Sequence, residues 1–322
     1  MQPQYDVIAL GELLIDFTEY GTSEQGNPLW EANPGGAPCN VLAMLNRLGR
    51  KTAFIGKVGN DVYGRQLRDT VQSAGIDTTY LFSDPVVHTT LAVVHTFPNG
   101  DRDFSFYRDP GADMMLREEE LPGLLIKNCR IFHFGTLSMT HDGVRQATKA
   151  AVQMAKAAGA LLSFDPNLRP PLWKSEDLAK ENIEWGLAHC DILKIADNEL
   201  VFMTGETDFD KGAAVLQKKF PNIRLLNVTV GPDGSYCYYE NRRVYVPAFL
   251  LGGTIETTGA GDTFCACVLH DVLNLGLESR SDESLMDMLR YANAAAYLVT
   301  TKKGAIRSMP SPDEIAVLLN NN

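Results

Sequence analysis

The stretch TIETTGAGDTF, residues 254–264, places two glycines around an alanine and follows them at once with an aspartate. Beyond it, apolar residues recur at helical spacing until a glycine at position 276, where a helix C-cap is expected. Residues 259–261 are therefore predicted to form the turn that begins a helix.

The predicted helix start is a candidate anion site. The first N–H groups of a helix lack an internal partner, the helix dipole adds partial positive charge there, and Gly259 and Gly261 let a ligand approach the backbone. Asp262, which follows them, has two readings. It caps the first turn of the helix, or it takes a proton from a hydroxyl as a general base. Spacing alone leaves both open.

Strand-like and helix-like patterns alternate along the rest of the chain. The apolar run Tyr5–Leu10 predicts a buried strand, and residues 40–48 predict a helix that stops at Gly49. Similar pairs follow to beyond residue 200. This alternation predicts an α/β fold with a central, mostly parallel sheet and helices on both of its faces.

Residues 87–113 break the alternation. Two β-rich runs, TTLAVVHTF and RDFSFYR, flank the tip Pro98-Asn99-Gly100-Asp101, which is a strong hairpin signal. We expect a small β-sheet lid, formed from about residues 12–34 and 87–113, on a single domain that spans residues 1–322. A surface hairpin without a role is the alternative.

Composition excludes several classes of function. The chain has 322 residues and a formal net charge of −11, which argues against nucleic acid and anionic membranes as partners. Its six cysteines form no CxxC pair, as expected for free thiols in a reducing compartment. The first residues lack the pattern of a signal peptide, so a cytoplasmic location is expected.

Familiar phosphate and metal motifs are missing. Residues 59–66 have the glycine spacing of a P-loop, but Arg65 replaces its lysine and Gln66 its Ser/Thr. No GxGxxG follows the first strand, and the histidines form no ligand-spaced cluster. The turn at 259–261 is therefore the remaining candidate for a phosphate site.

Polar and glycine residues gather where the predicted strands end. Ligands of open α/β sheets bind at the carboxyl ends of the strands, so these groups have the layout of an active site. For Asp16, which is one of these groups, the alternative is a loop residue whose charge is solvated. The groups are Asp16, the turn Gly35-Gly36 with Asn40, DPNLR at 165–169, Asn198 with Glu199, and TVGPDG at 229–234.

Taken together and in this order, the motifs resemble those of the PfkB (ribokinase-like) carbohydrate kinase family over nearly the whole chain. TTGAGDTF closely matches the C-terminal signature of that family, and GGAPCN resembles its N-terminal glycine motif. PGGAPCN together with FYRDPGAD, residues 106–113, is most similar to bacterial fructokinases. The resemblance implies a ribokinase-like kinase domain that transfers the γ-phosphoryl group of ATP, with Mg2+, to a sugar hydroxyl.

The resemblance also implies roles for individual residues. Asp262 matches the catalytic base, and Gly259, Ala260 and Gly261 match an anion hole for the transferring phosphoryl group. The positions matching the sugar site are Asp16, Gly35, Gly36, Asn40, Phe106, Arg108 and Arg169. Those matching the nucleotide site are Lys194, Asn198, Thr229, Gly231, Gly234, Gly261 and Asn293, with Glu199 facing hydrated Mg2+.

Many relatives bind a potassium ion beside the anion hole, largely through backbone carbonyls. The matching positions here are Glu256, Thr258, Val299, Lys302, Gly304 and Ser308. Potassium dependence stays open, because Glu256 stands where ribokinase carries an aspartate.

The lid strand RDFSFYR presents two faces. By the alternation of a strand, Phe104, Phe106 and Arg108 share one of them. We expect that face to meet the sugar, because a guanidinium donates several hydrogen bonds to hydroxyls. The alternative is that the two phenylalanines pack within the lid or at a homodimer contact through it.

The acceptor is predicted to be D-fructose, which would yield fructose 6-phosphate. Three other acceptors fit the same motifs: an aminoimidazole riboside, a nucleoside and 2-keto-3-deoxygluconate. A sugar- or nucleotide-binding regulator without catalysis is the alternative from another class. Retention of Asp262 beside an intact GAG turn counts against it.

Overall fold

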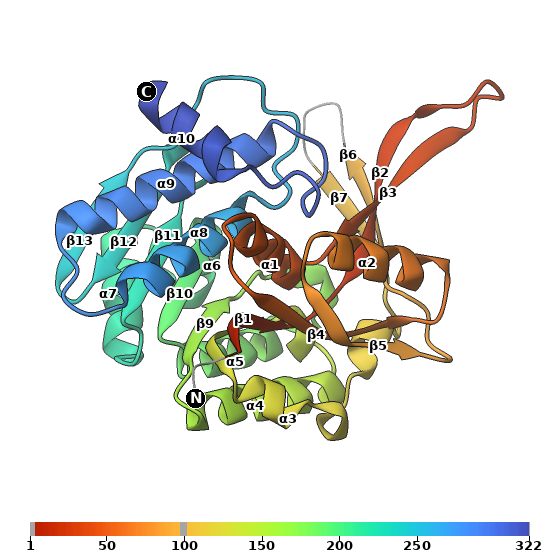
Figure 1. Cartoon of the computed structure of the whole chain (residues 1–322), viewed down its shortest axis with the longest axis horizontal. Coiled ribbons are helices and arrows are strands. Elements are labelled where there is room, and N and C mark those ends of the chain that lie inside the picture. The colour runs from red at the N-terminus through yellow and green to blue at the C-terminus, as the bar shows by residue number, and fades with distance from the viewer. Residues whose placement is uncertain (1–3, 97–101, 322) are drawn as a thin grey trace.

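The computed structural model describes residues 4–96 and 102–321 and contains two β-sheets of different size (Figure 1). The larger sheet has nine strands in the order β13-β12-β11-β10-β9-β8-β1-β4-β5. Its pairings are parallel from β11 to β5, whereas β12 and β13 are antiparallel additions at one edge. The strands are β1 (Tyr5–Leu10), β4 (Thr52–Gly59), β5 (Asp77–Asp84), β8 (Cys129–Gly135), β9 (Leu161–Asp165), β10 (Ile192–Ala196), β11 (Leu225–Thr229), β12 (Ser235–Tyr239) and β13 (Arg242–Val246).

The large sheet is buried on both faces, which explains its continuous apolar runs. In β1, Val7 and Ala9 join one hydrophobic cluster, while Ile8 and Leu10 join the other. Each strand therefore contributes alternate side chains to two separate cores.

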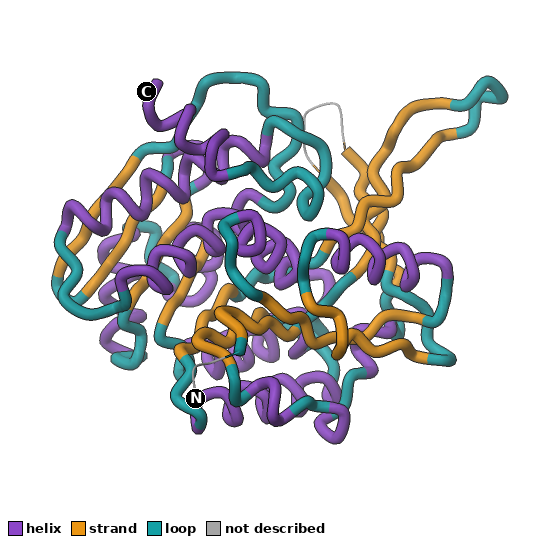
Figure 2. Tube along the Cα trace, viewed as in Figure 1, coloured by secondary structure: helices purple, strands orange, loops and turns teal. Residues whose placement is uncertain are grey.

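Helices cover the two faces as the sequence predicted (Figures 1 and 2). One face carries α1 (Ala37–Arg47), α2 (Val62–Ser73), α8 (Ala260–Leu275), α9 (Asp282–Thr300) and α10 (Pro312–Asn321). The other carries α3 (Gly123–Ile126), α4 (Asp142–Ala157), α5 (Glu176–Leu187), α6 (Asp197–Thr204) and α7 (Phe209–Lys219). Short 3-10 turns are η1 (Ala112–Met115), η2 (Glu118–Glu120), η3 (Leu137–Met139), η4 (Pro170–Leu172) and η5 (Gly231–Asp233). None of the helices in the described part of the chain is long and apolar enough to cross a membrane.

The smaller sheet has the order β3-β2-β6-β7 and confirms the predicted antiparallel pair around the Asn-Gly tip. That tip, at 98–101, lies outside the described residues, as does the side chain of Phe104. The β2–β3 hairpin projects from the body of the molecule (Figure 1). The strands are β2 (Leu14–Thr22), β3 (Pro28–Gly35), β6 (Leu91–Thr96) and β7 (Arg102–Tyr107).

The first two of the four crossings between the large sheet and the small one shape the space between them. The chain leaves β1 through Gly11 and Glu12 into β2, and it returns from β3 through Gly36 into α1. Gly36 has a φ of 137°, and a Cβ there would lie 2.5 Å from the Glu12 carbonyl oxygen. Only glycine fits where the two crossings pass this closely.

Two helical glycines in the large-sheet layers test how tightly this core is packed. A Cβ at Gly186, in α5, would lie 2.3 Å from the Phe164 ring, whereas one at Gly143, in α4, would meet nothing nearer than 3.9 Å. Gly186→Ala should therefore destabilise the fold by about 1–3 kcal/mol. Gly143→Ala should be neutral or stabilising by up to about 1 kcal/mol. Denaturant unfolding of both variants checks this; equal effects would contradict the packing described.

Candidate active site

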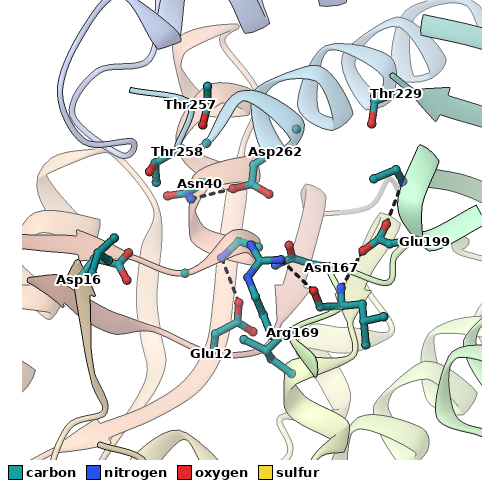
Figure 3. A pocket seen from close by; sticks show the side chains of 18 of the residues that line it. Glu12, Asp16, Asn40, Asn167, Arg169, Glu199, Thr229, Thr257, Thr258 and Asp262 are labelled. Atoms are coloured by element: carbon teal, nitrogen blue, oxygen red, sulfur yellow. Dashed lines mark hydrogen bonds between the residues drawn. The ribbon is translucent and has the colours of Figure 1, made fainter. Parts of the chain in front are cut away.

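A polar cavity of about 450 Å3 lies between the carboxyl ends of the large sheet and the root of the small one (Figure 3). A second cavity, of about 320 Å3, adjoins it, and the two share Thr229, Gly231, Thr257 and Gly261. The first is lined mainly by charged and amide side chains, the second mainly by apolar ones. This pair suits a polar acceptor and an apolar ring, with a phosphate chain between them.

Helix α8 begins at the junction of the two cavities, as the GAG turn predicted. Gly259 is its N-cap, with a φ of 80°, and a Cβ there would lie 2.8 Å from the Ala305 Cβ. A Cβ at Gly261 would lie 3.1 Å from the Lys194 Nζ. Both glycines are needed, the first for its left-handed backbone and the second for the approach of an ammonium group to the helix start.

Asp262 lies in the first turn of α8 and reaches into the polar cavity. Its Oδ2 accepts a hydrogen bond of 2.7 Å from the Asn40 amide. Burial raises the pKa of Asp262 to about 6; the charge of Asp165 adds to this effect, and Asn40, Lys194 and Arg169 oppose it. Figure 3 shows Asp16 on one side of Asp262 and Glu199 and Thr229 on the other. The carboxylate therefore lies between the two ends of the cavity.

A buried ion pair lies beside the start of helix α8. Lys194, in β10, lies 3.1 Å from the carboxylate of Asp165, at the end of β9, and their side chains are 8% and 3% exposed. Burial alone would lower the pKa of Lys194, but the charges of Asp165, Glu199 and Asp262 outweigh it and raise the pKa above its usual value. Lys194 is therefore a fixed cation beside Gly261, suited to a phosphate.

Glu199 is turned inward from the start of α6. Its two oxygens accept hydrogen bonds from the backbone of Leu168, at 2.6 Å, and of Ala196, at 2.8 Å. Burial raises the pKa of Glu199, and the Lys194 charge opposes that shift. Each oxygen has a further lone pair, so the residue fits the outer position of a hydrated Mg2+. Asn198, beside it, also lines the polar cavity.

The far end of the polar cavity holds most of the residues expected for the sugar. Asp16 comes from β2, and a Cβ at Gly35 would lie 2.4 Å from its carboxylate, so Gly35 makes room for it without lining the cavity. Burial raises the pKa of Asp16 to about 7, opposed by the charge of Arg169. The Oδ1 of the buried Asn40 has no hydrogen-bond partner among the residues that the structure describes. Gly36, Phe106 and Arg169 also line this end.

Arg108 requires a correction. It is not among the residues that line the cavity, and its side chain is only 2% exposed. Its guanidinium instead bonds Asp113, Thr140 and the Leu137 carbonyl. Strand alternation does not apply to it, because β7 ends at Tyr107. The guanidinium therefore has its acceptors inside the protein rather than on a ligand.

The predicted nucleotide residues gather around the apolar cavity. Thr229, Gly231 and Gly234 form the turn between β11 and β12, and Gly234 has a φ of 109°. Asn293, in α9, also lines this cavity, but its amide donates to the carbonyls of Val246 and Pro247. It shapes the wall of the cavity by holding the loop after β13.

The residues matched to a potassium site come from two adjacent segments. The backbone N–H groups of Ile255 and Glu256 donate to the Thr300 carbonyl, at 2.8 and 3.1 Å. The Glu256 carboxylate accepts from the Gly304 N–H, at 3.1 Å, and from the Thr258 hydroxyl. No three His, Cys, Asp or Glu residues cluster as metal ligands in the described ranges. The remaining members of the set, Val299, Lys302 and Ser308, lie on the second segment.

The sequence prediction missed Glu12. This buried acid follows β1 directly, lines the polar cavity and accepts a hydrogen bond of 3.0 Å from the Ala37 N–H at the start of α1. Burial raises the pKa of Glu12 to about 7. The signal was present in GELLID, where an acid stands at the carboxyl end of the first strand.

Comparison with known proteins agrees with this geometry. The family model described as pfkB family carbohydrate kinase matches residues 4–312. The chain is 41% identical over 320 residues to probable fructokinase-7 of Arabidopsis thaliana, covering 98% of this chain and 92% of the relative.

Two solved structures are similar over almost their whole length. Fructokinase with bound ATP from Xylella fastidiosa is 30% identical, with a TM-score of 0.86 and 98% coverage of both chains. A fructokinase double mutant from Vibrio cholerae O395, in a fructose, ADP and potassium ion bound form, is 28% identical, with a TM-score of 0.85 and 99% coverage of both chains. The predicted ribokinase-like fold is thus confirmed, and the chain belongs to the pfkB family of carbohydrate kinases.

Proposed function

We propose that this kinase transfers the γ-phosphoryl group of ATP to the 6-hydroxyl of D-fructose. The observation that carries the proposal is the Asp262 carboxylate, which lies partly buried in the polar cavity at the start of α8, where the apolar cavity also begins. The fructokinases among the similar proteins favour fructose as the acceptor.

Each step has a group in the right region of the cavity. The acceptor lies between Asp16, Asn40, Arg169 and Phe106, with Gly36 beside it. Asp262 removes the hydroxyl proton, while the Asn40 amide donates a hydrogen bond to Oδ2 of the same carboxylate. The start of α8, with Gly259, Ala260 and Gly261, and the Lys194 ammonium stabilise the charge on the transferring phosphoryl group.

The nucleotide occupies the other end. Its base lies in the apolar cavity, and its phosphates extend past Thr229 and Gly231 toward Lys194 and Asn198. Glu199 would hold a hydrated Mg2+, which would supply neutralisation of the phosphate charge. K+ would lie behind the anion hole on the carbonyls of the 256–258 and 299–308 segments.

The other acceptors are separated from fructose by one assay. ADP release is measured with fructose, other hexoses, an aminoimidazole riboside, nucleosides and 2-keto-3-deoxygluconate. Release with fructose far above the rest is expected. Release with a riboside or a nucleoside instead would mean that this compound, and not fructose, is the acceptor. Release with none of them would favour a binding protein without catalysis.

Asp262→Asn tests the base. The substitution keeps the shape and the contact with Asn40 but removes the proton acceptor, so kcat should fall by about 10²–10⁴-fold with little change in fructose affinity. Asp271→Asn, on the same helix but paired with Arg280 away from the cavity, is the matched control and should keep near wild-type rates. Wild-type turnover by Asp262→Asn would exclude the base assignment.

The dependence of kcat/KM on pH tests the raised pKa of Asp262. Asp262 must be ionised to accept a proton, and its pKa is raised to about 6 by burial, so kcat/KM should rise with pH through about 6 and then level off. Asp165→Asn removes a negative charge that raises this pKa and leaves Lys194 with one fewer negative neighbour. Both changes favour the ionised form, so the acidic limb should move to lower pH.

The control for that shift is Asp191→Asn. Asp191 precedes β10 at the opposite end of the sheet, where it accepts from the Leu162 N–H at 2.8 Å. It should leave the acidic limb in place. An Asp165→Asn limb that stays at the wild-type position would contradict the charge arrangement.

We also propose that the small sheet is the lid of this site, that the protein is cytoplasmic and that it forms a homodimer through the lid. Among the side chains of the lid that the structure describes, Tyr20, Leu29, Trp30 and Tyr107 are large, apolar and exposed. A small sheet with such a surface gains stability from a partner. Light scattering of the wild-type protein should give twice the monomer mass, and Trp30→Glu should reduce the measured mass. A wild-type monomer at micromolar concentration would exclude the dimer.

A further inference from the structure

We propose that Arg108 is a positioning residue, which fixes the root of the small sheet against the large one and so sets the affinity for the sugar without touching it. This inference rests on the proposed function for the identity of the sugar. It assigns Arg108, with Asp113, a part in acceptor recognition that lies behind the wall of the cavity.

The guanidinium joins parts of the chain that belong to both sheets. Nε and Nη2 donate to the Asp113 carboxylate at 2.9 and 2.7 Å. Nη1 donates to the Thr140 hydroxyl at 2.7 Å, and Nη2 also donates to the Leu137 carbonyl at 2.9 Å. Arg108 directly follows β7 of the small sheet, whereas Leu137 and Thr140 follow β8 of the large one. Four of the five N–H groups of the side chain are thereby used inside the protein.

Asp113 connects this pair to the other strand of the hairpin. Its carboxylate also accepts from the hydroxyl of Thr90, which directly precedes β6. A Cβ at Gly111 would lie 2.8 Å from this carboxylate and 2.9 Å from the Arg108 side chain, so no space is left around the pair. Both strands of the hairpin are therefore held at one point.

The ion pair of Arg108 and Asp113 lies directly behind residues that line the polar cavity. Leu137, whose carbonyl Arg108 holds, lines the polar cavity, and so does Phe106, two positions before Arg108. Glu12, another lining residue, is close enough for its carboxyl to sense the charges of Arg108 and Asp113. Loosening the pair would move several walls of the sugar end at once. The lining of the apolar cavity includes none of these residues.

Arg108→Lys is the first test. Lysine keeps the charge but lacks the planar fork that reaches Asp113, Thr140 and Leu137 together. The KM for fructose should rise about tenfold, as expected for loss of charged hydrogen bonds, while the KM for ATP stays within about twofold. Thr140→Val removes one acceptor and keeps the ion pair, so it should raise the fructose KM by about threefold. If Arg108→Lys does not fold, Thr140→Val serves as the test of the proposal.

Arg280→Lys is the matched control. Arg280 is also buried, and its guanidinium likewise bonds a carboxylate, a hydroxyl and carbonyls, at Asp271, Ser284 and Gly276, away from both cavities. It should leave both KM values near those of the wild type. A fructose KM that rises equally in this variant would mean that the Arg108 effect is general loss of stability, and would overturn the proposal.

Deoxy analogues separate positioning from direct contact. With a series of monodeoxyfructoses, Arg108→Lys should raise KM by the same factor for every analogue that is phosphorylated. A factor that disappears for one analogue would mean that Arg108 donates to the missing hydroxyl, and would overturn the proposal. An unchanged fructose KM, or an equal rise for ATP, would overturn it as well.

The proposed function fails separately, if the wild-type enzyme does not phosphorylate fructose. The same variants are then compared on the acceptor that the wild-type enzyme does accept.

Discussion

The partly buried Asp262 carboxylate at the start of α8 is the constraint on which the rest of this structure depends. Burying an ionised group costs much free energy unless hydrogen bonds and opposite charges compensate. Asp262 receives one hydrogen bond from Asn40 and feels the charges of Lys194 and Arg169. The arrangement is a balance, because Asp165 holds Lys194 in place while its own charge raises the pKa of Asp262.

That balance needs several distant segments at one point. Asn40 comes from α1, Lys194 from β10 and Asp262 from α8, and each lies near the carboxyl edge of the large sheet. The parallel order of the sheet brings these strand ends together. Strands β2, β6 and β7 of the small sheet contribute to the wall of the polar cavity, and a second buried ion pair, Arg108 with Asp113, lies at the root of this sheet. We propose that the first pair tunes the pKa of Asp262 and that the second shapes the acceptor site.

Local signals in the sequence predicted the elements that local physics controls. The GAG turn at 259–261 begins α8, the run Tyr5–Leu10 is β1, and TVGPDG forms the turn between β11 and β12. Glycine, helix periodicity and strand alternation act over a few residues, so they can be read without the fold. The order of the motifs added the family, which spacing alone did not give.

The errors arose where tertiary contacts decide. Arg108 was placed on the sugar face by alternation, but the strand had ended and a carboxylate five residues later was the nearer partner. Asn293 lines the apolar cavity, but its amide donates to the carbonyls of Val246 and Pro247, 47 and 46 positions away, a contact that the local sequence does not show. Glu12 was overlooked although it stands at the carboxyl end of the first strand, because GELLID does not show that both of its acids line the same cavity. Hydrogen bonds between distant segments leave no local pattern.

A structure of the enzyme with fructose and a non-hydrolysable ATP analogue would test directly whether Asp262 is the general base. We expect a sugar hydroxyl about 2.6–3.2 Å from the Asp262 carboxylate, the hydrogen-bond distance for a general base. We also expect the terminal phosphate against Gly259, Ala260 and Gly261, with the base of the nucleotide in the apolar cavity. A terminal phosphate bound elsewhere, or a sugar that leaves Asp262 without contact to any hydroxyl, would contradict these expectations.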